Sequence, residues 1–320
     1  MYNIITLLLL FTPTILSDGA SYSWGYTGDN GPDKWKDTCS DGIHQSPIDI
    51  SGENVIVKHM PRLHFVKYNH KGNITLINTG SSIMASGFTD WKNNRPYIAG
   101  GGLNSKYHLV QWHIHWAQEN GNGSEHTMGM LHYPAEIHFV HVKDGLTVSQ
   151  ALEQSDGLAV VGAFFVVKNG GSNSFFSENN GINMESFFDS IADKDMNTTV
   201  SHHRPRTLLP KSVDSFYRYE GSLTTPGCNE AVVWTVLDNP IVINQEEMNA
   251  LRRIKTVTHN NRPTQPLNGR KIFYRPHNIQ SFLTDYIAQM PRSSTSKTIP
   301  SNYITVIPLI FAMIFKNFHY

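Results

Sequence analysis

The amino-acid sequence predicts a single, mainly β domain with short peripheral helices. Segments rich in β-branched and aromatic residues recur along the chain, and such segments are typical of strands. Gly- and Asn-rich segments separate them, as loops separate short strands. Helical patterns are few and short. These observations predict an α+β domain dominated by strands over about residues 21–290.

The predicted elements follow from local patterns along this region. Five segments are β-branched or aromatic and several of them alternate, so they are predicted strands. These are Asn73–Asn78, Tyr107–Trp116, Ala135–Val142, Leu158–Val167 and Ala231–Leu237. Three segments have helical patterns, and the last begins with Asn244 as a plausible N-cap. These are Ser149–Gln154, Asn183–Ala192 and Asn244–Arg253.

The composition excludes several classes of protein. The chain has 320 residues, with 26 Lys and Arg against 26 Asp and Glu, so it has no net charge to attract nucleic acid as its main partner. A hydrophobic content of 39% excludes a largely disordered chain. Two cysteines exclude a disulfide-dense scaffold. The 16 histidines hint at metal binding, because histidine is the commonest metal ligand.

Both ends of the chain look like targeting segments. Residues 1–20 contain the apolar run Ile4–Phe11 followed by small residues, which predicts a secretory signal peptide, with a buried strand or helix as the alternative. In residues 291–320, small residues at Ser293 and Ser294 precede a polar spacer and the apolar run Tyr303–Phe315. This order predicts a GPI-anchor signal with a removed tail; a marginal transmembrane or interfacial tail is the alternative.

A secreted, lipid-anchored chain would lie on the extracellular face of the plasma membrane. Three sequons are then glycosylation candidates, at Asn73, Asn122 and Asn197. In an oxidising compartment Cys39 and Cys228 would form a disulfide, and two free buried thiols are the alternative. If the anchor prediction is wrong, the chain is expected to be secreted.

Three histidines predict a metal site. His113 and His115 lie two residues apart in a predicted strand and therefore share one face. His138 lies in the next predicted strand and reaches the same face if the two strands pair. Three neutral imidazoles with one open position form a catalytic zinc site. Glu136 and Gln111 each stand two residues from a ligand and can accept its other ring N–H.

An alternative interpretation as an iron site needs only the first of these two predicted strands and the residues just after it. His113, His115 and Glu119 match the 2-His-1-carboxylate iron site of a cupin oxygenase. That alternative leaves unexplained the hydroxyl-rich loop Gly221–Cys228, which precedes a predicted strand.

With these motifs in order, the sequence closely resembles the α-class carbonic anhydrases over about residues 21–290. The secreted and membrane-anchored members of this family share the Cys39–Cys228 pairing pattern and the lipid-anchor tail. The matching segments are Trp24–Tyr26, Gln45–Asp49, Gln111–Trp116, Gly123–His126, Ala135–His141, Ser222–Pro226 and Asn260–Pro263.

The resemblance implies a fold and a reaction. The fold is a large, twisted, mostly antiparallel sheet of about ten strands, with Zn²⁺ at the base of a cone-shaped cleft. The reaction is the reversible hydration of carbon dioxide to bicarbonate and a proton. Sulfonamide- or anion-type inhibitors are expected at the zinc.

The resemblance also assigns roles to individual residues. Thr224 would accept the proton of the zinc-bound hydroxide, and Glu125 would accept the proton of Thr224. Thr225 would contact bicarbonate, Tyr26 would support an ordered water, and Asn260 would support the metal ligands. An apolar wall would hold carbon dioxide. Its members are Val140, Val160, Leu223, Val232 and Trp234.

One position departs from the fast members of this family. Ser81 stands where they have a histidine that carries protons out of the cavity. Serine does not titrate near neutral pH, so proton export is expected to limit turnover unless another histidine replaces it. The non-enzyme alternative is a catalytically silent carbonic-anhydrase-like domain used for surface binding or adhesion.

Overall fold

The computed structural model describes residues 24–168, 188–254 and 258–277, all within one compact unit that ends at His277. The described helices are few and short: α2 (Thr38–Asp41), α3 (Val148–Leu152) and α6 (Gln245–Arg252), with 3₁₀ segments such as η4 (Phe88–Asn94). The described strands are β1 (Asp49–Ile50), β2 (Val55–Val57), β3 (Leu63–Val66), β4 (Gly72–Asn78), β5 (Ile83–Ser86), β6 (Tyr97–Gly100), β7 (Tyr107–Trp116), β8 (Thr127–Met128), β9 (Ala135–Lys143), β10 (Leu158–Val167), β11 (Asn197–His203), β12 (Phe216–Gly221), β13 (Val232–Ile243) and β14 (Ile272–Arg275).

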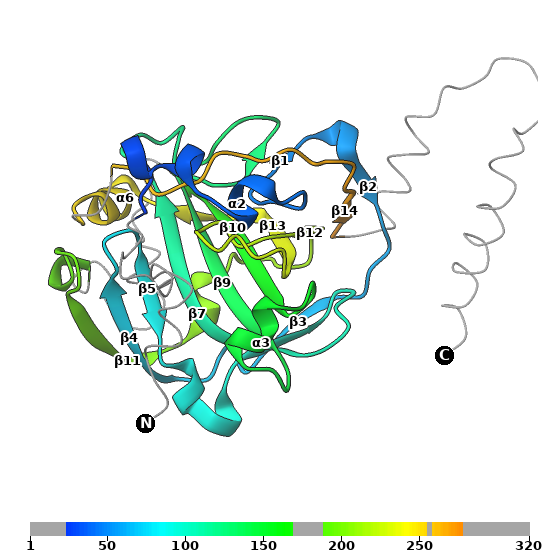
Figure 1. Ribbon diagram of the computed structural model, residues 1–320. Coiled ribbons are helices and arrows are strands. Elements are labelled where there is room, and N and C mark those ends of the chain that lie inside the picture. The colour runs from blue at the N-terminus through cyan, green and yellow to red at the C-terminus, as the bar shows by residue number, and fades with distance from the viewer. Residues whose placement is uncertain (1–23, 169–187, 255–257, 278–320) are drawn as a thin grey trace, which may run out of the picture. The chain divides into compact units, whose positions relative to one another are not determined.

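The described strands form one large sheet of 12 strands and a small one of two, β1 and β8. The main path through the large sheet runs β11-β4-β5-β7-β9-β10-β13-β12-β14-β2. Most neighbours are antiparallel, and the pairs β10–β13 and β14–β2 are parallel. Strands β7, β9 and β10 lie side by side in the interior of this sheet (Figure 1). The predicted mainly β fold is confirmed, with 12 strands in place of about ten.

The long strands agree with the sequence-based predictions. β7 and β10 have the predicted bounds, and β4 and β9 differ by one residue at one end. β13 is longer than predicted, because it continues through Asp238–Pro240 to Ile243. It does so by pairing with β10 after a register shift between Ala163 and Phe165, so tertiary pairing overrides a turn-like sequence.

The helices were predicted less completely. α6 begins at the predicted cap, where Asn244 and Glu247 form a reciprocal capping box, and α3 differs from its prediction by one or two residues at each end. Most of the predicted helix Asn183–Ala192 lies outside the described residues.

The short strands that complete the sheet, such as β5, β12 and β14, were not predicted, because a run of four to six residues carries little periodicity.

Two apolar clusters fill the two faces of the sheet. One contains Trp112, Ile114 and Phe139, and the other contains Val140 and Val160. Alternation along β7 therefore directs one set of side chains into the first cluster and the intervening set to the opposite face. A register shift between Leu109 and Gln111 sets which residues of β7 face which side.

Among the described residues, no helix combines the length and the hydropathy needed to cross a membrane. The predicted signal peptide (residues 1–20) and the predicted anchor segment (residues 291–320) lie outside the described residues.

Candidate metal centre

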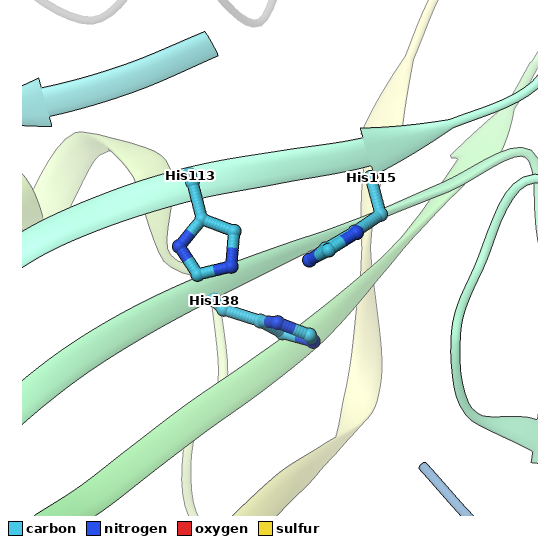
Figure 2. A group of neighbouring side chains, drawn as sticks. All are labelled: His113, His115 and His138. Carbon is cyan, nitrogen blue, oxygen red and sulfur yellow. The ribbon is translucent and has the colours of Figure 1, made fainter. Parts of the chain in front are cut away.

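His113, His115 and His138 meet on one face of the sheet. β7 and β9 are antiparallel, and His113 lies directly opposite His138 in their register. The ring centroids are 4.9 Å apart for His113 and His115, 5.2 Å for His113 and His138, and 4.6 Å for His115 and His138. One ring nitrogen of each histidine lies within 4.8 Å of a ring nitrogen of the other two. Figure 2 shows the three rings turned toward one another. The cluster predicted from the spacing of the histidines therefore forms.

Each imidazole is oriented by a hydrogen bond from its other ring nitrogen. His113 Nδ1–H donates to Gln111 Oε1 at 2.9 Å, and His138 Nε2–H donates to Glu136 Oε1 at 2.8 Å. His115 Nδ1–H donates to the backbone oxygen of Asn260 at 2.6 Å. These bonds leave Nε2 of His113, Nε2 of His115 and Nδ1 of His138 to face the centre of the cluster.

The three rings suit a divalent metal ion because they are neutral. Their exposed fractions are 5%, 0% and 1%. Burial lowers the pKa of all three rings, and that of His115 to about 3, so each keeps a lone pair at neutral pH. Nε2 of His115 is buried and has no hydrogen-bond partner among the described residues. Three neutral imidazoles with an unpartnered nitrogen aimed inward fit Zn²⁺.

A second group of ligand-type side chains shares His138, namely His126 and Glu136. His126 Nδ1 contacts Glu136 Oε1 at 2.7 Å, and its Nε2 contacts the Tyr219 hydroxyl at 2.6 Å. Both ring nitrogens of His126 are thus already engaged, so the group of three histidines is the better metal site.

Glu136 is a buried anion behind His138. Its Oε2 accepts the backbone N–H groups of Glu125 and His126 at 3.0 and 2.8 Å. Burial alone would raise the pKa of Glu136, but the adjacent His126 and His138 outweigh burial and hold it well below its usual value. His126 and Tyr219 were not predicted as site residues. For His126, its position in the Gly123–His126 motif could have indicated that it belongs to the site.

Glu125 lies on the other side of the centre, with Oε2 3.4 Å from Nε2 of His115. Its Oε1 accepts the backbone N–H of Arg262 at 2.9 Å. Burial raises the pKa of Glu125, and hydrogen bonds from the Arg262 backbone and the Thr224 hydroxyl act in the opposite direction. The structure thus links Glu125 and Thr224, which are 99 positions apart in the sequence.

A hollow opens beside the histidines. It is lined by two of the three imidazole rings, the glutamine that accepts a hydrogen bond from one of them, the two threonines and most of the predicted apolar wall. Its lining residues are Gln111, His113, His138, Val140, Val160, Leu223, Thr224, Thr225 and Trp234. Val232 is fully buried in the adjoining apolar cluster and does not line the hollow. One side of the hollow is therefore apolar and the other carries imidazoles and hydroxyls.

Tyr26, Ser81 and Asn260 are predicted site residues that do not line the hollow. Tyr26 is buried against Trp24 and Trp35, and burial raises its pKa well above the usual value. Ser81 is half-buried, with its hydroxyl 3.1 Å from that of Thr79. Asn260 donates its side-chain N–H to the backbone oxygen of Ser81 at 2.9 Å. Asn260 therefore ties the Ser81 loop to the strand that carries His115.

The predicted disulfide joins Cys39 to Cys228 across 189 positions of sequence. Cys228 closes the loop that carries the hydroxyl groups, since its backbone N–H donates to the Thr225 oxygen at 2.9 Å. Its backbone oxygen accepts the side-chain N–H of Gln45 at 3.1 Å. The disulfide thus anchors the Thr224–Thr225 loop to α2.

The three sequon asparagines, Asn73, Asn122 and Asn197, are all exposed. The two predicted anchor positions, Ser293 and Ser294, lie outside the described residues.

Comparison with known proteins agrees with this site. Residues 30–276 match the family model described as "Eukaryotic-type carbonic anhydrase". The chain is 42% identical over 278 residues to "Putative carbonic anhydrase 5" of Caenorhabditis elegans, an alignment that covers 85% of this chain and 88% of that relative. It is 34% identical over 263 residues to "Carbonic anhydrase 3" of Mus musculus, covering 78% of this chain and 96% of the relative. The chain therefore belongs to the eukaryotic-type carbonic anhydrase family.

Proposed function

We propose that the chain catalyses the reversible hydration of carbon dioxide to bicarbonate and a proton, with Zn²⁺ on His113, His115 and His138. The observation that carries this proposal is the hollow, in which neutral imidazoles face an apolar wall. Zinc bound there would supply Lewis-acid activation of water at neutral pH, as it does in carbonic anhydrases generally. The remaining tasks fall to residues of this chain.

Thr224 orients the attacking oxygen. Its hydroxyl proton is directed at Glu125, so the lone pairs of the Thr224 oxygen are left to accept a proton from the nucleophile. The carboxylate of Glu125 is held in place because the backbone N–H of Arg262 donates to its Oε1. The nucleophile is then held with a lone pair toward the substrate, which reduces the cost of orientation.

The apolar wall binds the substrate. Carbon dioxide has no net charge or dipole, so burial against hydrocarbon and aromatic surface is the interaction available to it. Val140, Val160 and Trp234 supply that surface next to the histidines. Thr225, on the same lining, is suited to donate a hydrogen bond to bicarbonate.

Proton export is the slow step in this proposal. Ser81 does not titrate near neutral pH, and its hydroxyl lies beside that of Thr79. Apart from His113 and His138, no histidine among the described residues lines the hollow. External buffer is therefore expected to carry the proton.

Stopped-flow measurement of carbon dioxide hydration over a series of buffer concentrations tests the function and the slow step together. The proposal predicts activity that a zinc chelator abolishes and that rises with buffer concentration. Ser81→His should raise turnover at low buffer and change it little at high buffer. Turnover that does not depend on buffer would refute the export argument but keep the enzyme. A folded, zinc-loaded protein without activity would favour the surface-binding or adhesion alternative.

The proposed location is the extracellular face of the plasma membrane, with residues 1–20 as signal peptide and a GPI anchor at Ser293 or Ser294. The Cys39–Cys228 disulfide and the exposed sequons support an oxidising, secretory route. Release of the protein from intact cells by a phosphatidylinositol-specific phospholipase would support the anchor, and recovery of all protein in the medium would contradict it. Sulfonamides and small anions are expected to inhibit by binding at the zinc.

A further inference from the structure

Two of the three sequons lie on the same face of one strand pair. β4 and β11 are antiparallel, and Thr75 of one sequon lies directly opposite Thr199 of the other. Asn73 and Asn197 each stand two residues from these threonines, so all four side chains share a face. Within the described residues, β11 is the outermost strand on this side of the sheet. The third sequon, at Asn122, lies in the turn between β7 and β8.

A second hollow opens beside Asn73, away from the metal centre. The last β5 residue paired with β4 is Ser86, opposite Thr75, so the start of β4 is not paired with β5. The space there is about 510 Å³ and open to solvent, within the range of small-ligand pockets. Its lining residues are Gly72, Asn73, Ile74, Thr75, Gly87, Asp90, Trp91 and Thr199.

Trp91 forms a fixed wall of this hollow. Its indole Nε1–H donates to the backbone oxygen of Asn73 at 2.8 Å. A Cβ added at Gly72 would lie 2.1 Å from the Trp91 ring, so only glycine allows the ring to lie against the strand. The hollow thus offers the 9% of Trp91 that stays exposed, the exposed carboxylate of Asp90 and the exposed hydroxyl of Thr199. A sugar can use this combination, since it has apolar C–H groups and polar hydroxyl and acetamido groups.

We propose that Asn73 and Asn197 carry N-linked glycans on one face of the β4–β11 pair, and that the hollow beside Trp91 holds the first N-acetylglucosamine of the Asn73 glycan. The sugar covers the part of β4 left unpaired by β5, and the Asn197 glycan covers the outer strand β11. Glycans placed there shield the strand that is outermost among the described residues, and an outer strand can pair with another chain. This proposal rests on the secretory route proposed above and is independent of the reaction.

Glycopeptide mass spectrometry of the full chain, expressed in eukaryotic cells with its own leader, tests the first part. Glycan on both Asn73 and Asn197 is the expected result. Glycan on Asn122 with Asn73 unmodified would overturn the proposal and leave the secretory route standing. If all three sequons are unmodified, this proposal fails. The phospholipase experiment then decides the secretory route, and the carbon dioxide hydration assay decides the reaction.

Thermal unfolding tests the second part. Trimming with an endoglycosidase that leaves one N-acetylglucosamine should keep the Tm of the glycosylated protein, whereas Asn73→Gln should lower it by about 2–4 °C. Asp90→Asn should lower the Tm in glycosylated protein only. Asn122→Gln is the matched control and should leave the Tm unchanged.

The same variants made without glycans in a bacterial periplasm separate the sugar from the side chains. There, Asn73→Gln and Asp90→Asn should not change the Tm relative to the unglycosylated parent. An equal loss in both preparations assigns the effect to the side chains and overturns the proposal. A glycan at Asn73 whose complete loss leaves the Tm unchanged also overturns it.

Discussion

The two faces of β7 and β9 are equally buried but are held together in different ways. On one face Trp112, Ile114 and Phe139 pack into an apolar cluster and are fully buried. On the other face His113 and His138 occupy the intervening positions and contact Gln111, Glu136 and the centre. The apolar face needs only complementary shape, because its side chains carry few polar groups.

The polar face needs a partner for every buried nitrogen and oxygen, since an unpaired polar group in the interior costs about 1–3 kcal/mol. Gln111 and Glu136 are local partners, two residues from His113 and His138, but others come from distant segments. Asn260 supports His115 from 145 positions away, and Arg262 holds Glu125 from 137 positions away. The comparison predicts that a substitution on the polar face acts on metal and activity, and one on the apolar face acts on stability.

The largest expected effect is that of His115→Ala. The variant keeps two imidazoles, and the loss of the third ligand should abolish stoichiometric zinc binding and lower kcat/KM by at least about a thousandfold. Zinc content by elemental analysis and stopped-flow rates are the measurements. A Tm close to that of zinc-free wild type would show that the fold is kept. Near-normal activity with a full zinc content would contradict the assigned ligand set.

Phe139→Ala is the matched change on the opposite face of the adjacent strand. It removes a fully buried ring from the apolar cluster and should lower the free energy of unfolding by about 3–5 kcal/mol. Urea unfolding measures this loss. The folded fraction should still bind one zinc ion and hydrate carbon dioxide, because no ligand or support is touched. A selective loss of zinc in folded protein would mean that the two faces are not independent.

Glu136→Gln sharpens the comparison within the polar face. The amide keeps the shape but removes the anion that accepts from both His126 and His138. Zinc affinity should fall about 10–100-fold, as is usual for a residue that supports a metal ligand. Competition with a chromogenic chelator gives the affinity. An unchanged affinity would show that the charge of Glu136 does not act on the metal centre.

Acid stability tests the histidines that do not bind metal. Burial lowers the pKa of His203 to about 3 from an ordinary 6.5, so between these values the unfolded chain binds more protons. The contribution of His203 to the free energy of unfolding is therefore present above pH 6.5 and is lost as the pH falls toward 3. At pH 5 about 2 kcal/mol of this contribution has been lost.

His203→Gln can retain an acceptor for the Trp112 indole N–H, which donates to His203 Nε2 at 3.4 Å. Zinc-loaded wild type and variant should both unfold more easily at pH 5 than at pH 7, and the difference should be about 2 kcal/mol smaller in the variant. Identical pH dependence in the two proteins would contradict the lowered pKa of His203.

The sequence predicted the strands that form the apolar face and the three metal ligands, but fewer of the residues that hold those ligands in place. The alternation in Tyr107–Trp116 and Ala135–Val142 was enough to predict both strands and the convergence of His113, His115 and His138. Glu125 and Thr224 were assigned only through the family resemblance, because a local pattern contains no information on contacts between distant loops. The same limit explains why His126 and Tyr219 were missed.

Short strands were also beyond local prediction. β5 has four residues, yet its Met84 lies directly opposite His113 and so helps to position β7. Such a segment becomes a strand because its neighbours supply hydrogen-bond partners, which is a tertiary effect.

Zinc titration of metal-free protein, followed by carbon dioxide hydration rates at high buffer, tests the central claim most directly. The account predicts no activity without zinc, a rise in proportion to bound zinc, and a plateau at one zinc ion per chain. A folded chain that binds one zinc ion and stays inactive, or that is fully active without zinc, would contradict it.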